Sequence, residues 1–251
     1  MSSAHSSRPH TTLRSPTKPS AAGHTSASSP RSSRHGHGHG HPAPVVTASA
    51  GCFVSADARI EGTLNLGIGC VLHPRCAVLV GPGASLTMGS GCVVEENAVV
   101  RFAGPGAATL GSNNVFMVAC VADLVADAGG NSMGSWNSFA PRSCVEGVRV
   151  GDQCTFAAGT ATNASHPFLQ VKGDEGKAAA DSDGDAFMRT TGHPAAGAAP
   201  PLVPSRTVVH GGASNARTWD GSGEKQEMAL RSGATEYLRE VLPKFNKQRA
   251  L

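Results

Sequence analysis

The chain has 251 residues, enough for one or two domains, with a formal net charge of only +3 and aromatic residues at 4%. No run approaches the roughly 18 consecutive apolar residues that a membrane span needs, and basic residues are not interleaved with aromatic ones, so neither membrane insertion nor nucleic-acid binding is expected. A core made without bulky aromatic anchors favours thin, regular layers of aliphatic and small side chains.

Residues 1–45 form a basic stretch rich in Ser, Pro and His, and the first acidic residue of the chain is Asp57. So few large apolar groups cannot offset the entropy of ordering the backbone, which predicts a disordered tail. The Ser- and Arg-bearing composition also resembles an organellar targeting segment, although the many prolines argue against an amphipathic targeting helix.

A six-residue repeat begins after this tail. Large apolar residues recur without a slip at Val54, Ile60, Leu66, Leu72 and Val78, and the frame restarts at Met88, Leu110, Met133 and Val150. The position four residues later is usually small or compact, as at Cys70 and Cys76. Neither a helical period of 3.6 nor a strand alternation of 2 produces this spacing, whereas one short strand and one turn do. The pattern predicts a single left-handed parallel β-helix of hexapeptide repeats over residues 46–163, an all-β fold.

The frame is interrupted at residues 79–87, 101–109 and 123–132, where we expect surface loops. A longer stretch at residues 164–206, rich in Ala, Gly, Pro and Asp, is predicted to be a flexible insertion. Residues 207–251 are expected to give a last strand beginning at Thr207 and then an α-helix over residues 224–243, ended by Pro243. The helix is expected to pack along the β-helix and, with part of its surface, to meet a partner.

The seven cysteines give no sign of a disulfide framework or a zinc ribbon, because their number is odd and no Cys-x-x-Cys pair occurs. Most of them fall at the small position of the repeat, where a thiol acts as a small apolar side chain. We therefore expect buried free thiols in a reducing compartment, the cytosol.

Hexapeptide β-helix proteins are either enzymes or non-catalytic scaffolds, and the number and position of their histidines help to distinguish the two classes. A zinc enzyme needs three imidazoles around the metal, and an acyltransferase needs one histidine as general base. Seven of the eleven histidines precede residue 45, and His73 is the one within the repeats, with His166 just after them. We expect no catalytic residue, no cofactor and no metal; the alternative is a homotrimeric acyltransferase, with His73 or His166 as its base, or a γ-carbonic-anhydrase-like enzyme.

The order of segments resembles the dynactin subunit 6 family of β-helix subunits. The resemblance rests on Leu-His-Pro-Arg-Cys-Ala at 72–77, Leu-Gly-Ser-Asn-Asn-Val-Phe at 110–116, Thr-Val-Val-His-Gly at 207–211 and Leu-Pro-Lys-Phe at 242–245. It covers roughly residues 46–163 and 206–246. The long tail and the long stretch at 164–206 depart from the family.

The resemblance implies a non-catalytic structural subunit of the pointed-end complex of dynactin, in the cytoplasm and on the cytoskeleton. Its implied partners are a sister β-helix subunit, in a heterodimer, an actin-related protein at the pointed end, and other dynactin subunits that support dynein-based microtubule transport. Candidate partner contacts are Trp136, Arg142, Tyr237, Leu238, Val241, Leu242 and Phe245.

Overall fold

The structure, a computed structural model, describes residues 43–169 and 199–250. The predicted disordered tail, except for its last three residues, and most of the predicted insertion at 164–206 lie outside these ranges. None of the helices within them is long and apolar enough to cross a membrane.

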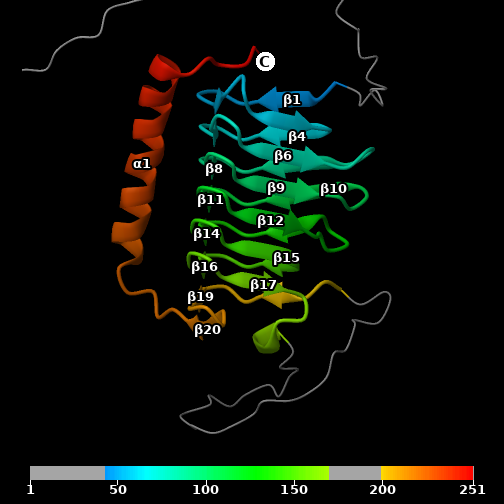
Figure 1. Ribbon diagram of the computed structural model, residues 1–251, viewed down its shortest axis with the longest axis vertical. Helices are drawn as coiled ribbons and strands as arrows, with labels where there is room; N and C mark the ends of the chain where they lie inside the picture. Colours follow the sequence, from blue (N-terminus) through cyan, green and yellow to red (C-terminus); the bar gives the residue numbers. More distant parts are fainter. Residues whose placement is uncertain (1–42, 170–198, 251) are drawn as a thin grey trace, which may run out of the picture. The chain divides into compact units, whose positions relative to one another are not determined.

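The chain winds as stacked coils whose parallel strands form three faces, which confirms the predicted left-handed β-helix (Figure 1). The first face contains β1 (Val45–Ala48), β4 (Thr63–Leu66), β7 (Ser85–Met88), β10 (Ala107–Leu110), β13 (Asn131–Met133), the end of β15 (Cys144–Val150) and β18 (Leu202–Val203). The second face contains β2 (Phe53–Val54), β5 (Val71–Leu72), β8 (Val93–Val94), β11 (Val115–Phe116), β14 (Ser138–Phe139), β16 (Thr155–Phe156) and β19 (Thr207–His210). The third face contains β3 (Arg59–Glu61), β6 (Ala77–Val80), β9 (Val99–Phe102), β12 (Val121–Leu124), the start of β15 and β17 (Ala161–Asn163), after which comes a 3₁₀ turn, η1 (Pro167–Leu169).

The register stacks like positions of the repeat in columns inside the coils. Leu72 pairs with Val94 and Val94 with Phe116, and the column continues through Phe139 and Phe156. The three phenylalanine rings stack with centroids 4.8 and 4.9 Å apart. Each buried aliphatic or aromatic side chain contributes on the order of 1.5–3 kcal/mol, so stability grows as coils are added.

The predicted loops at 79–87, 101–109 and 123–132 are confirmed only in their middle parts, because the residues at both ends of each stretch lengthen strands instead. The first coil takes 18 residues, from Val45 to Thr63, whereas the next takes 22, from Thr63 to Ser85. Some of the added residues lengthen the strands on the two sides of this corner, where side chains continue to point alternately inward and outward. Val80, Phe102 and Leu124 therefore form another buried column. Residues 81–84, 103–106 and 125–130 remain outside the strands and form the loops at this corner.

The C-terminal part covers both ends of the second face. At one end β20 (Asn215–Thr218) pairs antiparallel with β19. The helix α1 (Glu224–Phe245) then runs back along the coils, with Pro243 inside its last turn instead of at its end (Figure 1). At the other end, the Ala56 amide donates to the Lys247 carbonyl and the Arg249 amide to the Val54 carbonyl, both at 2.8 Å. Unpaired strand edges invite association. The pairing of β20 protects the edge at one end of the face, and the pairing of residues 247–249 protects the edge at the other end.

Candidate partner-binding site

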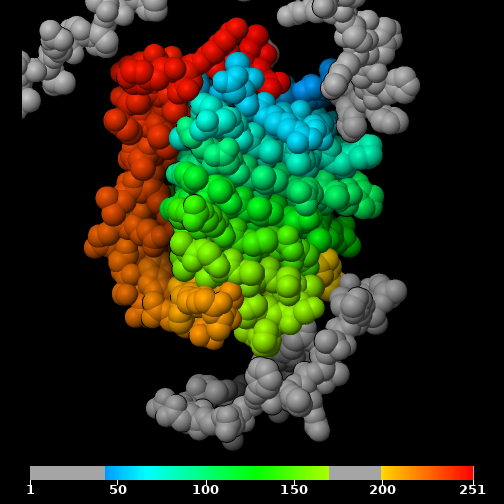
Figure 2. Space-filling model, in the orientation of Figure 1, coloured from blue at the N-terminus to red at the C-terminus, as the bar shows by residue number. Residues whose placement is uncertain are grey.

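The inner side of α1 packs on the outward side chains of the second face. Leu238 and Leu242 contact a cluster made by Phe53, Val71 and Val93, which are all at most 2% exposed. These are outward positions of the first coils, where the sequence places apolar residues on both sides of the strand. Figure 2 shows α1, coloured orange to red, lying along the stacked coils.

Polar contacts fix the helix at the corner between the first and second faces. The Nε of Arg239 donates to the Gly51 carbonyl at 2.9 Å, and its guanidinium lies where a Cβ of Gly51 would be. Gly51 also has a φ of +69°. Glycine is therefore required here both for the left-handed backbone and for the close approach of the arginine.

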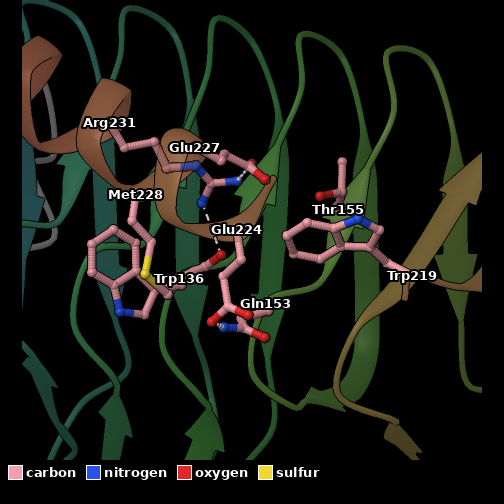
Figure 3. A pocket seen from close by; sticks show the side chains of 8 residues that line it. All are labelled: Trp136, Gln153, Thr155, Trp219, Glu224, Glu227, Met228 and Arg231. Atoms are coloured by element: carbon pink, nitrogen blue, oxygen red, sulfur yellow. Dashed lines mark hydrogen bonds and ion pairs between the residues drawn. The ribbon is translucent and has the colours of Figure 1, made fainter. Parts of the chain in front are cut away.

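Trp136 lies at the same corner, beneath the first turns of α1. The Nη1 of Arg231 donates to the Trp136 carbonyl at 2.8 Å, and Arg231 pairs with Glu227. Trp136, Trp219, Gln153, Thr155, Glu224, Glu227, Met228 and Arg231 line a small pocket (Figure 3). Both tryptophans of the chain are thus half-buried next to the helix and help to hold it in place.

Glu224 completes this attachment. It accepts a hydrogen bond from the side-chain amide of Gln153 and forms an ion pair of 3.4 Å with Arg206, whose Nε donates to Gln153 at 3.0 Å. The first and last turns of the helix are therefore both fixed to the coils, one by polar groups and one mainly by apolar groups.

The outer side of α1 carries large apolar groups. Leu230 is 75% exposed, Tyr237 63% and Phe245 80%, and their spacing of seven and eight residues aligns them along one side of the helix. Val241 is half-buried one turn after Tyr237. We call Leu230, Tyr237, Val241 and Phe245 the outer stripe. A surface of this kind is typical of a contact with another protein.

The predicted contact residues therefore separate into groups. Tyr237, Val241 and Phe245 belong to the outer stripe, whereas Leu238, Leu242 and Trp136 hold the helix in place. Arg142 is exposed at the corner between the second and third faces, with a φ of +59°. Leu230 was not among the predicted contacts, although its position seven residues before Tyr237 on the helix indicates it.

The two histidines that an enzyme would depend on lie on different parts of the coils. His73 follows β5; burial lowers its pKa, and its Nε2 is buried with no hydrogen-bond partner among the described residues. His166 follows β17 and packs against Phe168, with ring centroids 4.6 Å apart and ring planes tilted by 54°; burial lowers its pKa. Across residues 43–169 and 199–250, no group of three His, Cys, Asp or Glu side chains is placed to hold a metal ion.

Several cysteines lie at the corner between the first and second faces, stacked in a column from coil to coil. Asparagines take the same position in the later coils. The thiols of Cys70 and Cys92 donate to the carbonyls of Gly89 and Gly111 at 3.1 and 3.3 Å. In the next coil the Asn114 amide nitrogen donates to Gly111 and Gly134, both at 2.9 Å. The inward-facing glycine carbonyls need donors, and the repeat supplies either a thiol or an amide. This role of Asn114 was missed, although its place in the six-residue frame indicates it.

All seven cysteines are free, as the sequence predicts, and all except Cys52 and Cys144 are buried. Burial raises the pKa of the Cys76 and Cys120 thiols to about 12. Such thiols stay protonated at neutral pH, which makes them poor nucleophiles.

No protein-family model matches the chain, and no well-characterised protein matches it in sequence. The fold and the site define a left-handed parallel β-helix protein with a C-terminal helix fixed along one face. This fold is shared by enzymes and structural proteins, so function has to be inferred from the surfaces.

Proposed function

We propose that the chain is a non-catalytic structural subunit of a dynactin-type pointed-end complex, which supports dynein-based transport along microtubules. The observation that carries this proposal is the outer stripe. Leu230, Tyr237 and Phe245 expose 63 to 80% of their surface on a helix whose inner side is already packed. Exposed aromatic and leucine side chains in one line favour a protein partner.

The attachment of α1 supports the same function. Apolar packing at one end and the Arg231 and Glu224 contacts at the other hold the helix against a stack of coils. A surface that is rigid before binding loses little conformational entropy when the partner arrives. This is what a scaffold requires of a docking surface.

The alternative is a homotrimeric acyltransferase or carbonic-anhydrase-like enzyme, and His73 is the repeat residue on which it would depend. A general base must present a ring nitrogen to its substrate. The Nε2 of His73 is instead buried, and the neighbouring corner carries the Arg75–Glu96 ion pair at 2.5 Å. This environment favours a structural histidine.

Affinity purification of the tagged full chain from its own cells tests the proposal. We expect an actin-related protein and a second β-helix chain to co-purify with the wild type and to be lost from Tyr237→Asp. Ser232→Asp, an exposed position on the same helix outside the outer stripe, is the matched control and should keep both partners. Wild-type protein that brings down no actin-related protein would contradict the proposed function.

A further inference from the structure

Three cysteines stand at the same position in the first three coils. Cys52, Cys70 and Cys92 lie at the corner between the first and second faces, where the Phe53 amide donates to the Cys70 carbonyl and the Val71 amide to the Cys92 carbonyl, both at 2.9 Å. The other four cysteines of the chain have no thiol at the matching position of the adjoining coils. This corner is therefore where thiols of successive coils face one another.

The spacing of Cys52 and Cys70 suits a disulfide. Paired positions of neighbouring strands are about 4.8 Å apart, within the range of about 4.4–6.8 Å between the Cα atoms of a disulfide. The Sγ of Cys52 donates to the Gly67 carbonyl at 3.0 Å, so this thiol points toward the second coil, in which Cys70 lies. The thiol of Cys70 donates to the Gly89 carbonyl at 3.1 Å, and a turn about its Cα–Cβ bond brings it to Cys52.

One thiol of the column is open to solvent. Cys52 is half-buried, whereas Cys70 and Cys92 are each 1% exposed. Cys52 lines an open hollow of about 310 Å³ between the first coil and the last turns of α1, where Arg239 and Pro243 form the opposite wall. Figure 2 shows this end of the helix, coloured red, beside the first coils in blue and cyan. A small oxidant that enters the hollow therefore meets Cys52 first and finds Cys70 directly behind it.

We propose that Cys52 and Cys70 form a reversible disulfide site that reacts with hydrogen peroxide. The Cys52 thiolate attacks one peroxide oxygen, so that an S–O bond forms, the O–O bond breaks and water leaves, which gives a sulfenic acid. The Cys70 thiolate then attacks the Cys52 sulfur, so that the S–S bond forms and the S–O bond breaks with loss of a second water. Two thiols and one peroxide give one disulfide and two waters, and the peroxide accepts both electrons.

The surroundings of Cys52 make this reaction slow. Burial raises the pKa of the Cys52 thiol, and the neighbouring Cys70 thiol raises it as well. The thiolate is the reactive form, and little of it is present at neutral pH. The bridge therefore forms under sustained exposure to peroxide, and reducing thiols of the cytosol reopen it. This inference is independent of the proposed function.

The bridge would stabilise the end of the stack. It joins the first coil to the second across the 18 residues of one coil. A terminal coil has a neighbour on one side only, which makes it prone to open first. The same coil receives the end of α1, where the Nε of Arg239 donates to the Gly51 carbonyl. Closing the loop restricts the unfolded chain, so oxidation should raise the melting temperature by about 5–10 °C.

Mass spectrometry of the full chain after treatment with excess hydrogen peroxide tests the inference. Digestion without reductant should release the peptide of Cys52 linked to the peptide of Cys70, and dithiothreitol should separate them. Cys52→Ala should remove both the link and the rise in melting temperature. Cys144→Ala is the matched control, because Cys144 is also half-buried but has no thiol beside it in the column, and it should keep both.

Several results would overturn the inference. One is sulfinic acid on Cys52 with no link to Cys70, which would mean that the second thiol cannot reach the first. Another is a link between Cys70 and Cys92, or between the Cys52 residues of two chains. An oxidised wild type that contains the link but melts at the same temperature as the reduced protein would refute the stabilisation of the first coil. Each of these results leaves the proposed function unaffected.

Discussion

At the scale of single residues, glycine sets how closely the coils approach one another. Gly67, Gly89 and Gly111 occupy the same place in successive coils, and a Cβ built on Gly89 would lie 2.6 Å from the carbonyl carbon of Gly111. That distance is far below van der Waals contact, and its neighbour is backbone. An added methyl group here has to push two coils apart.

Substitution of Gly89 by Ala should therefore destabilise the protein by about 1–3 kcal/mol, the usual cost of overpacking. Gly233 is the control, because it lies in α1 and a Cβ there meets nothing within 4 Å. Gly233→Ala should stabilise the protein by up to about 1 kcal/mol through helix propensity. Thermal unfolding of the two variants checks both signs, and equal effects would contradict the close approach of the coils.

His73 gives the protein a pH dependence of stability. Because burial lowers its pKa in the folded state, protonation favours the unfolded chain. The stabilisation is complete above the unfolded pKa of about 6.5 and is lost as pH falls below it. The melting temperature should drop between about pH 7.5 and pH 5.5, and His73→Gln should reduce the drop. Comparing the wild type with His73→Gln separates the contribution of His73 from that of Glu95. Burial raises the pKa of Glu95, so its effect on the pH dependence of stability has the opposite sign. An identical drop in both would refute this role.

At the scale of elements, neighbouring residues of α1 have opposite tasks. Leu238 packs on the second face, whereas Tyr237 points outward and is 63% exposed. Leu238→Ala should lower the free energy of unfolding by about 1–2 kcal/mol, less than a fully buried leucine would. Tyr237→Ala should change stability by less than about 0.5 kcal/mol but weaken partner recovery. Chemical denaturation of both variants measures this contrast, and the opposite order would mean that the two sides of the helix are misassigned.

The β-helix and its inward columns were predictable from the repeat, because the large apolar residue stands at the same position of each six-residue unit and is buried there in every coil. The lengthened strands were missed because the six-residue frame breaks at residues 79–87, yet Val78, Val80, Leu86 and Met88 alternate there with a period of two. That alternation was the available signal.

The contact residues were less predictable than the fold. Tyr237 and Leu238 are adjacent and both apolar, so only the docking of α1 on Phe53, Val71 and Val93 decides which one faces outward. The pairing of Lys247 and Arg249 with the first coil likewise depends on where the helix ends in space. Separations of nearly 200 residues leave no local pattern in the sequence.

At the scale of the whole molecule, the described surfaces suit a subunit with several neighbours. The outer stripe of α1 is apolar, the first four strands of the first face carry no charged residue, and the third face carries ion pairs. Surfaces of such different character favour contacts with different proteins over the identical contacts of a symmetric homotrimer. A chain of this kind is expected to be a monomer until it enters its complex.

The most direct test of the central claim is the native mass of the purified full-length chain, measured together with its metal content. The structural-subunit account predicts a monomer of 25.4 kDa without stoichiometric metal. A stable homotrimer would contradict it, with or without bound zinc, and would make His73 and His166 the first residues to test for catalysis.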